Sequence, residues 1–360
     1  MNLSDFDYEL PESLIAQTPA KVRDQSRLLV YNRASGVTEH RKFADILEYL
    51  RSGDVLVINS TRVNRARVFG KRGETRIEVF LLKRTTDPKN PRATDKTPHP
   101  VVYDVLLRPA KKVKIGDMVV IADGVSGTCI SKDIADGTAV MEFNADPEPY
   151  GEMPLPPYIK TGGASDGERY QTVYAHDEKD GSSAAPTAGL HWTPELLERA
   201  RAMGVTVCEI VLTVGLGTFR PVKTENILEH KMHSEHFVIP HATADIINRA
   251  KADGRRVICV GTTVVRALES GACDAQRVLG ADKAGSFFVK AGEGDTDIFI
   301  YPPYKFRVCD ALVTNFHLPK STLLILVSAF LGREKAIEIY KDAIKNKYRF
   351  FSFGDACFFV

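Results

Sequence analysis

The chain has 360 residues, of which 44% are hydrophobic, and a net charge of +2. This length allows a sizeable core and favours two domains over one. The six cysteines are scattered without a C-x-x-C pair, which is typical of reduced thiols in a cytoplasmic protein rather than of a secreted disulfide framework. The first ten residues include three acidic side chains and no apolar core, so we expect no signal peptide. The longest apolar run, 323–331, is too short to span a bilayer.

The sequence of residues 1–60 predicts compact α/β structure. Residues 45–49 have helical spacing, and the apolar run 55–58 predicts a buried strand. This strand ends in the polar sequence Asn59-Ser60-Thr61-Arg62. Ligands of open α/β sheets bind where strands end in this way, although a strand that simply leaves the core has the same pattern.

The segment 62–114 is strongly basic, with 15 Lys and Arg residues against 5 Asp and Glu residues. Alternating runs separated by turn sequences predict short strands at 76–82, 101–107, 118–122 and 138–143. This spacing favours a small antiparallel barrel, with 87–100 as a surface loop. We therefore predict the α/β class: a larger, barrel-like α/β domain formed by 1–67 and 151–360, with a small antiparallel β-barrel domain inserted at 68–150.

The basic composition of this inserted domain suggests binding of a polyanion, because phosphate contacts dominate the affinity of such binding. A solvated face on a small soluble domain explains the same charge. No RNA-recognition signature with stacking aromatics accompanies it, so composition leaves both interpretations open.

Small residues surround one hydroxyl and one imidazole in the stretch 182–192, Ser-Ser-Ala-Ala-Pro-Thr-Ala-Gly-Leu-His-Trp. Thr187 and His191 are its chemically active side chains. Thr193 then predicts a helix start and Gly204 the helix end. A small-residue loop before a helix lets a ligand approach the backbone and its free N–H groups. A tight structural turn is the alternative.

A dinucleotide-binding site is not indicated. The strand expected at 205–214 runs into Gly215-Leu216-Gly217, but no third glycine and no helix follow to complete the fingerprint.

A metal site is not indicated either, although His230, His233 and His236 fall within seven residues. The alternating strand expected at 232–239 sends His233 and Glu235 to one face and His236 to the other, whereas metal ligands must converge. His233 and Glu235 can instead form an acid–base or hydrogen-bonding pair.

Two later strands also end in polar residues. The strand expected at 256–260 runs into Gly261-Thr262-Thr263 and a helix, an arrangement that can hold an anion or a ribose; N-capping by a threonine is the alternative. The strand expected at 311–314 runs into Asn315 and His317. Further elements are expected at 168–171 (a helix start), 242–252, 264–270, 322–331 and 334–344 (helices), and 297–301 (a strand). If the sheet is continuous, the polar strand ends and the 182–192 loop meet at its edge in one pocket.

A series of motifs, several of them long and specific, extends in order over nearly the whole chain. They are Asn59-Ser-Thr-Arg-Val63 with Ala66-Arg67, Pro154-Leu-Pro-Pro-Tyr-Ile159, Ala184-Ala-Pro-Thr-Ala-Gly-Leu-His191, Thr213-Val-Gly-Leu-Gly-Thr-Phe219, Met232-His-Ser-Glu235, Gly261-Thr-Thr263, Thr296-Asp-Ile-Phe-Ile-Tyr-Pro302, Thr314-Asn-Phe-His-Leu-Pro319 with Ser321-Thr-Leu-Leu324, and Tyr348-Arg-Phe-Phe-Ser352 with Gly354-Asp-Ala356. Together they resemble the S-adenosylmethionine:tRNA ribosyltransferase-isomerase family of queuosine biosynthesis.

This resemblance implies an α/β domain with an inserted β-barrel, no metal, and S-adenosylmethionine as co-substrate. The family transfers the ribosyl part of S-adenosylmethionine to 7-aminomethyl-7-deazaguanine at the wobble position of a tRNA. It rearranges that part to an epoxycyclopentanediol and releases adenine and methionine, which leaves epoxyqueuosine in the tRNA. We expect a cytoplasmic enzyme, acting as a monomer.

Such chemistry needs a base that removes a proton from the ribose carbon beside the sulfonium, and a proton donor to the departing adenine. For these roles we propose, with the first two preferred, His191, Glu235, His233 and His317. For binding S-adenosylmethionine we propose Thr187, Gly189, Gly217, Thr262, Thr263 and Asn315. For contacts with tRNA phosphates or the anticodon we propose Arg62, Arg67 and Arg349.

The chain departs from the family pattern at a few positions. Trp192 stands where phenylalanine is usual, Asn64 where proline is usual, Val264 where serine is common and Pro303 where glycine is usual. The residues alone also allow two other classes. A non-catalytic RNA-binding protein explains the basic barrel, and a generic sugar- or nucleotide-binding enzyme explains the polar strand ends.

Overall fold

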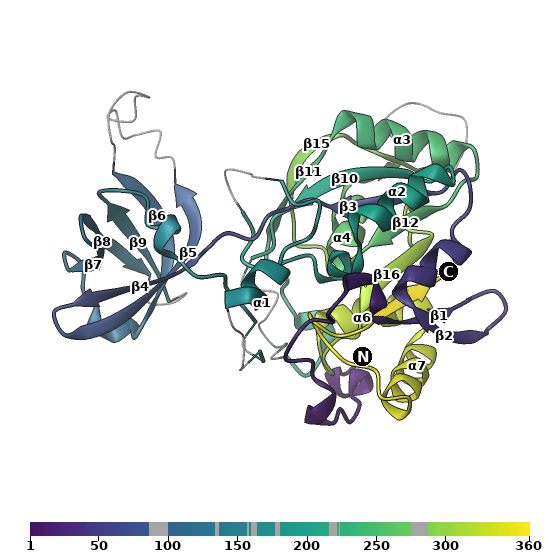
Figure 1. Ribbon diagram of the computed structural model, residues 1–360, viewed down its shortest axis with the longest axis horizontal. Helices are drawn as coiled ribbons and strands as arrows, with labels where there is room; N and C mark the ends of the chain where they lie inside the picture. Colours follow the sequence, from purple (N-terminus) through teal and green to yellow (C-terminus); the bar gives the residue numbers. More distant parts are fainter. Residues whose placement is uncertain are drawn as a thin grey trace. The chain divides into compact units, whose positions relative to one another are not determined.

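A computed structural model (Figure 1) describes residues 1–85, 100–133, 137–156, 158–159, 164–176, 181–215, 222, 224–274 and 287–360. The chain forms two compact units. The first comprises Met1–Arg62, Pro156–Asp177 and Ala185–Val360, and the second Val63–Leu155 and Glu178–Ala184. None of the helices in these described ranges combines the length and the apolar character needed to cross a bilayer.

A nine-stranded mixed sheet forms the centre of the first unit. Its order is β15-β11-β10-β3-β12-β16-β17-β1-β2. The strands in chain order are β1 (Arg27–Tyr31), β2 (Thr38–Lys42), β3 (Val55–Asn59), β10 (Thr206–Leu212), β11 (Glu235–Ile239), β12 (Val257–Val260), β15 (Gly292–Thr296), β16 (Ala311–Asn315) and β17 (Ala356–Phe359). The central strands β10, β3, β12 and β16 run parallel to one another, and antiparallel strands flank them.

Helices and short 3₁₀ segments cover the sheet. The helices are α1 (Ala164–Arg169), α2 (Pro194–Ala202), α3 (His241–Ala252), α4 (Thr262–Gly271), α6 (Thr322–Leu331) and α7 (Arg333–Lys345). The 3₁₀ segments of this unit are η1 (Leu3–Phe6), η2 (Glu12–Leu14), η3 (Arg23–Gln25), η4 (Phe43–Tyr49), η7 (Thr187–His191) and η9 (Ile227–Glu229). A two-stranded ribbon joins β13 (Ala272–Asp274) to β14 (Phe287–Val289).

Alternation along the parallel strands places the core on both faces of the sheet. Leu56 and Ile58 of β3 join one cluster with Trp192 and with side chains of η4 and α2, while Val55 and Val57 point the other way. Helices α3 and α4 contact the same central strands. Burial on both faces explains why residues 55–58 form a continuous apolar run instead of an alternating one.

The second unit contains a closed antiparallel barrel with the order β4-β5-β6-β9-β8-β7. Its strands are β4 (Arg67–Arg72), β5 (Thr75–Thr85), β6 (Val101–Arg108), β7 (Met118–Ala122), β8 (Val125–Asp133) and β9 (Thr138–Phe143), with 3₁₀ segments η5 (Ala110–Lys112) and η6 (Glu148–Tyr150). A separate apolar core fills it, including Val79, Val105 and Phe143. The predicted fold class is confirmed; most of the loop expected at 87–100 lies outside the described residues.

Several elements differ from the sequence-based expectations. The strand expected at 297–301 is wrong, because the edge strand β15 consists of the preceding residues and pairs with β11. The hydroxyl of Thr296 then accepts a hydrogen bond from the Ile298 N–H, which turns the backbone out of the ladder. The helix expected to open at 168–171 instead ends at Arg169, and the unpredicted strands β4 and β8 complete the barrel.

The helix start predicted at Thr193 is confirmed. Its Oγ1 accepts a hydrogen bond from the Leu196 N–H at 3.1 Å, and Pro194 occupies the first helical position. Gly204 beyond the helix has a φ of +87°, a conformation that favours glycine.

We predict that T193A lowers the free energy of unfolding by about 1 kcal/mol, because the N–H of Leu196 loses its acceptor. T193S keeps the hydroxyl and is the matched control. Urea denaturation of the two variants measures the difference. Equal stability of T193A and the wild type would contradict the capping role.

Candidate active site

Four polar or glycine-containing strand ends lie at one edge of the large sheet. Because β10, β3, β12 and β16 are parallel, Gly215, Asn59, Gly261 and Asn315 all stand at or just beyond the carboxyl ends of these neighbouring strands. Gly261 has a φ of +97°, and its N–H donates to the Val313 carbonyl of β16. This edge is where open α/β sheets bind their ligands.

The η7 segment packs against the same edge. A Cβ atom added to Gly261 would lie 3.7 Å from the Cβ of Ala188, and Asn315 is hydrogen-bonded to His191. The loop around Thr187 is therefore next to the ends of β12 and β16. Thr187 itself is half-buried.

His191 is buried and both ring nitrogens have partners. Nδ1 lies 2.7 Å from Ser26 Oγ, and Nε2 lies 3.2 Å from Asn315 Nδ2. Asn315 Nδ2 also donates to the Phe351 carbonyl at 3.1 Å, which fixes the amide orientation because a carbonyl can only accept. Nε2 of His191 must then accept, so Nδ1 carries the proton and donates to Ser26. Ser26 in turn donates to the Arg23 carbonyl.

This network leaves one polar atom without a partner. Asn315 Oδ1 is buried and has no hydrogen bond, and the side chain is only 2% exposed. Phe351, whose carbonyl holds the amide, has a φ of +71°, an uncommon conformation for a bulky residue. An unsatisfied buried acceptor at a sheet edge is a candidate contact for a bound ligand.

Burial lowers the pKa of the His191 imidazole to about 3, and the positive charges of Arg349 and Arg23 lower it further. The ring, stacked on Phe43, is therefore neutral at pH 7. A base with such a low pKa accepts protons poorly near neutrality.

Gly189 leaves room for the hydroxyl groups of Tyr174 and Thr172. A side chain there would clash with Tyr174 Oη and approach Thr172. The hydroxyls of Tyr174 and Thr172 are both buried without a hydrogen-bond partner.

At the start of α4, the N-cap is Gly261, not a threonine side chain. Thr262 is buried, and Thr263 Oγ1 is buried without a partner. The alternative of threonine capping is therefore wrong, and Thr263 keeps its hydroxyl available at the strand-end edge.

Glu235 forms a buried ion pair with Arg266 of α4. Its Oε1 also accepts a hydrogen bond from the Gly215 N–H at 3.3 Å. Arg266 donates further to the carbonyls of Thr296 and Ile298, and burial lowers its pKa to about 10. The pair thus joins the end of β10, the start of β11 and the end of β15.

The other two predicted histidines do not join these groups. His233 precedes β11 and is exposed, so it does not share a buried strand face with Glu235. His317 is buried, with Nε2 2.8 Å from Thr314 Oγ1, and burial lowers its pKa to about 3. Its carbonyl accepts a hydrogen bond from the Tyr8 hydroxyl, so it ties the N-terminal segment to the sheet. Gly217 lies outside the described residues.

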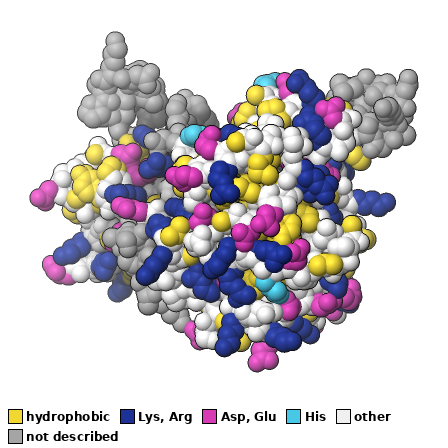
Figure 2. All heavy atoms as spheres, turned by 45° about the vertical axis from the view of Figure 1, so that its right-hand side comes forward, with side chains coloured by type: hydrophobic (Ala, Val, Ile, Leu, Met, Phe, Trp, Pro, Cys, Tyr) yellow, Lys and Arg dark blue, Asp and Glu magenta, His cyan; other side chains and the backbone are white. Residues whose placement is uncertain are grey.

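The three predicted tRNA-binding arginines have different surroundings. Arg62 is exposed. Arg67 in the barrel pairs with Glu78, with Nε 3.1 Å from Oε1. Arg349 donates to the carbonyls of Thr18 and Phe353, which gives it a structural task. On the face shown in Figure 2, Lys and Arg side chains alternate with acidic ones.

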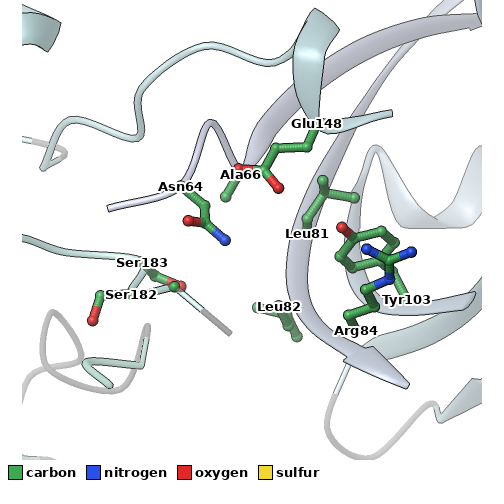
Figure 3. Close-up of a pocket in the computed structure, with 10 residues that line it drawn as sticks. Asn64, Ala66, Leu81, Leu82, Arg84, Tyr103, Glu148, Ser182 and Ser183 are labelled. Atoms are coloured by element: carbon green, nitrogen blue, oxygen red, sulfur yellow. The ribbon is translucent and has the colours of Figure 1, made fainter. Parts of the chain in front are cut away.

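The barrel unit has a hollow of its own, of about 340 Å³. In Figure 3 the carboxamide of Asn64 and the carboxylate of Glu148 point toward its centre, with Tyr103 and Arg84 on the opposite side. Gly181 is required here, because a side chain would clash with Asn64 Oδ1.

Comparison with known proteins decides the family. The chain is 48% identical to an S-adenosylmethionine:tRNA ribosyltransferase-isomerase of Desulfitobacterium hafniense, over 99% of both chains. It is 47% identical to the protein of the same name from Staphylococcus haemolyticus, over 100% of both. The family model described as "Queuosine biosynthesis protein" matches residues 3–359. The chain belongs to the S-adenosylmethionine:tRNA ribosyltransferase-isomerase family.

A solved member of this family has the same fold. The crystal structure of the S-adenosylmethionine tRNA ribosyltransferase from Thermotoga maritima matches with a TM-score of 0.53 and 36% identity, covering 99% of this chain and 100% of that one. The family resemblance inferred from the motifs is confirmed, and with it the class of enzyme. The rival interpretation as a non-catalytic RNA-binding protein is excluded.

Several residues around the candidate site escaped the sequence-based interpretation. Ser26 and Thr172 carry no local signal, because a single hydroxyl in a polar stretch is common. Tyr174 reads as an ordinary core residue. Phe351 matters here through its backbone carbonyl, and no side-chain pattern reports a backbone group.

We predict that acid weakens the fold through His191. The unfolded ring titrates near 6.5 and the folded ring near 3, so between these values unfolding takes up a proton, and stability falls as the pH falls. One such ring contributes about 1.4 kcal/mol per pH unit. H191N should therefore lose less stability than the wild type between pH 6.5 and pH 4.5. H233N, which changes an exposed ring, should keep the wild-type slope; equal slopes in all three proteins would refute the burial argument.

Proposed function

We propose that this enzyme transfers the ribosyl part of S-adenosylmethionine to the aminomethyl group of 7-aminomethyl-7-deazaguanine in the wobble position of a tRNA. The ribosyl part rearranges to an epoxycyclopentanediol, and adenine and methionine leave. The observation that carries this proposal is the end-to-end match with relatives named S-adenosylmethionine:tRNA ribosyltransferase-isomerase, at 47–49% identity. Because the match includes the barrel as well as the large sheet, it supports the whole activity and not one domain of it.

The reaction sets three tasks for the protein. A base removes a proton from the ribose carbon beside the sulfonium, a donor protonates the departing adenine, and the substrate amine is held near the sugar. The first two tasks need groups that change protonation state near neutral pH. The third needs fixed hydrogen-bonding groups.

We assign the fixed contacts to the unsatisfied atoms at the strand-end edge. Asn315 Oδ1 and Thr263 Oγ1 are buried acceptors without partners, and each can accept a hydrogen bond from a ribose hydroxyl. Thr262, Thr187 and the backbone at Gly189 stand beside them and support the same role. A ligand hydroxyl at Asn315 would relieve the cost of about 1–3 kcal/mol that an unpaired buried acceptor carries.

His191 suits positioning better than proton transfer. Its pKa of about 3 makes it a poor base, and its Nε2 already accepts from the Asn315 amide. We therefore revise the role expected from the sequence: His191 holds Asn315 in the orientation that leaves Oδ1 free for the substrate. His317 is not assigned proton transfer either, since it is buried in a structural contact. His233 is not assigned it because it is exposed and lies outside the group of residues at the strand ends.

Glu235 is the remaining candidate for the base. Its carboxylate is paired with the guanidinium of Arg266. It also lies beside Gly215, at the same edge as the ribose contacts.

Contacts with tRNA are proposed for the barrel and for Arg62. The basic excess in 62–114 supports this role. Arg67 and Arg349 are weaker candidates than the sequence suggests, because Glu78 and two backbone carbonyls respectively occupy their guanidinium groups.

The whole proposal is tested by incubating the enzyme with S-adenosylmethionine and tRNA that carries 7-aminomethyl-7-deazaguanine. We expect adenine release that depends on the modified base, with epoxyqueuosine in the digested tRNA. Unmodified tRNA is the control. Release from the free nucleoside at the same rate would favour a generic nucleoside enzyme instead.

E235Q should lower the single-turnover rate of adenine release by ~10²-fold or more if Glu235 is the base. The change also leaves Arg266 without its counter-charge, so the fold must be checked by circular dichroism and melting temperature. E269Q is the matched control, because Glu269 is an equally buried carboxylate whose partners in the described part of the chain are the Tyr304 hydroxyl and the N–H groups of residues 307–309. A folded E235Q that turns over as fast as E269Q would remove the assignment.

A further inference from the structure

A second hollow, in the large unit, is lined by His191 and by Ser26, the hydrogen-bond partner of its Nδ1. Its walls come from the N-terminal segment, the end of α1, η7 and the C-terminal segment. Arg23, Arg169, Ser26, His191 and Ser352 are its polar side chains. No acidic residue lines it.

In the described part of the chain, the two arginines of this hollow donate hydrogen bonds to backbone carbonyls. Arg23 donates to the carbonyls of Leu190 and Gln171, at 3.0 and 2.8 Å. Arg169 donates to the carbonyls of Lys21 and Ala20, at 3.1 and 2.8 Å. These bonds fix the planes of both guanidinium groups. Because the acceptors are neutral, they do not cancel the two positive charges.

The positive charges of the two arginines reinforce each other. The pKa of Arg23 is lowered, first by burial and then by the positive charge of Arg169, so the two cations are close enough to repel each other. Arg169 Nε is buried and has no hydrogen-bond partner. Within the described part of the chain, neither arginine pairs with a carboxylate.

Two other shielded arginines of the same unit are paired with carboxylates. Arg256 pairs with Asp54, and Arg266 with Glu235. Leaving a shielded charge unpaired is costly, so a fold that supplies carboxylates at these sites and none at Arg23 and Arg169 reserves the latter for an anion from outside.

The remaining polar groups of the hollow do not compete for that role. The His191 ring is neutral and gives its proton to Ser26, which donates to the Arg23 carbonyl. The Ser352 hydroxyl is engaged with Tyr158 at 2.6 Å. A guanidinium pair, with unused N–H donors and no acidic neighbour, matches the oxygens of a carboxylate or a phosphate.

We propose that Arg23 and Arg169 form an anion-binding site that holds a carboxylate or phosphate group of a substrate. The proposal rests on the proposed function, which offers two sources of such a group: the methionine carboxylate of S-adenosylmethionine and a phosphate of the tRNA backbone. In either case the site anchors a part of the substrate that does not react, and through Ser26 it adjoins the His191–Asn315 contact.

The test uses R169Q, in which the charge is lost and a hydrogen-bonding side chain remains, together with R23K, which keeps the charge but loses the planar fork. R27Q is the matched control. Arg27 also donates to a backbone carbonyl, that of Asn346, but stacks on Tyr348 outside the hollow. Melting temperatures of all three variants show that they fold.

Binding of S-adenosylmethionine, of its decarboxylated analogue and of substrate tRNA is then measured by calorimetry and by salt titration. If the carboxylate is the anion, R169Q weakens S-adenosylmethionine binding about tenfold and leaves the analogue unaffected. If a phosphate is the anion, R169Q weakens tRNA binding and reduces its salt slope by about one. R27Q should change neither affinity.

The proposal is overturned if folded R169Q and R23K bind both substrates as tightly as R27Q does. A binding test with inorganic phosphate, which needs no catalysis, distinguishes this outcome from a failure of the proposed function. Millimolar phosphate should raise the melting temperature of the wild-type chain and of R27Q but not of R169Q, whether or not the enzyme releases adenine. No such difference would refute the anion site alone.

Discussion

Parallel hydrogen bonding between β10, β3, β12 and β16 is the constraint on which the site depends. Neighbouring parallel strands must end at the same edge, so Gly215, Asn59, Gly261 and Asn315 are brought together although more than 250 residues separate the first from the last in the chain order. The crossover segments deliver the helix α4 and the loop η7 to that edge. Glycine at position 261 permits the positive φ of +97° at the end of β12.

Burial decides how the polar groups at this edge can act. Desolvation favours the neutral imidazole of His191 and lowers its pKa, so a residue type known for proton transfer becomes a fixed hydrogen-bonding group. Glu235 is paired with the guanidinium of Arg266 at the same depth. The type of a side chain suggests its chemistry. Burial and hydrogen-bond partners set its protonation state, which decides whether it can do that chemistry.

The arginines of the large unit extend the same reasoning. At Arg256 and Arg266, a carboxylate lies beside the guanidinium group. Where two guanidinium groups face a hollow with carbonyl partners alone, the missing charge points to a substrate. Arg23 and Arg169 stand far from any motif with an evident chemical signature, and their significance depends on their being neighbours in space.

The sequence by itself determined the family, the fold class and most elements, because long apolar runs, helix caps and turn residues act over a few neighbours. Thr193 caps the helix that its position indicates. Tertiary structure decided the rest. Edge strand β15 owes its existence to backbone pairing with β11, which side-chain pattern does not record. Likewise the protonation of His191, the orientation of Asn315 and the unpaired charge of Arg23 follow from burial and from partners distant in the chain, and no local spacing carries that information.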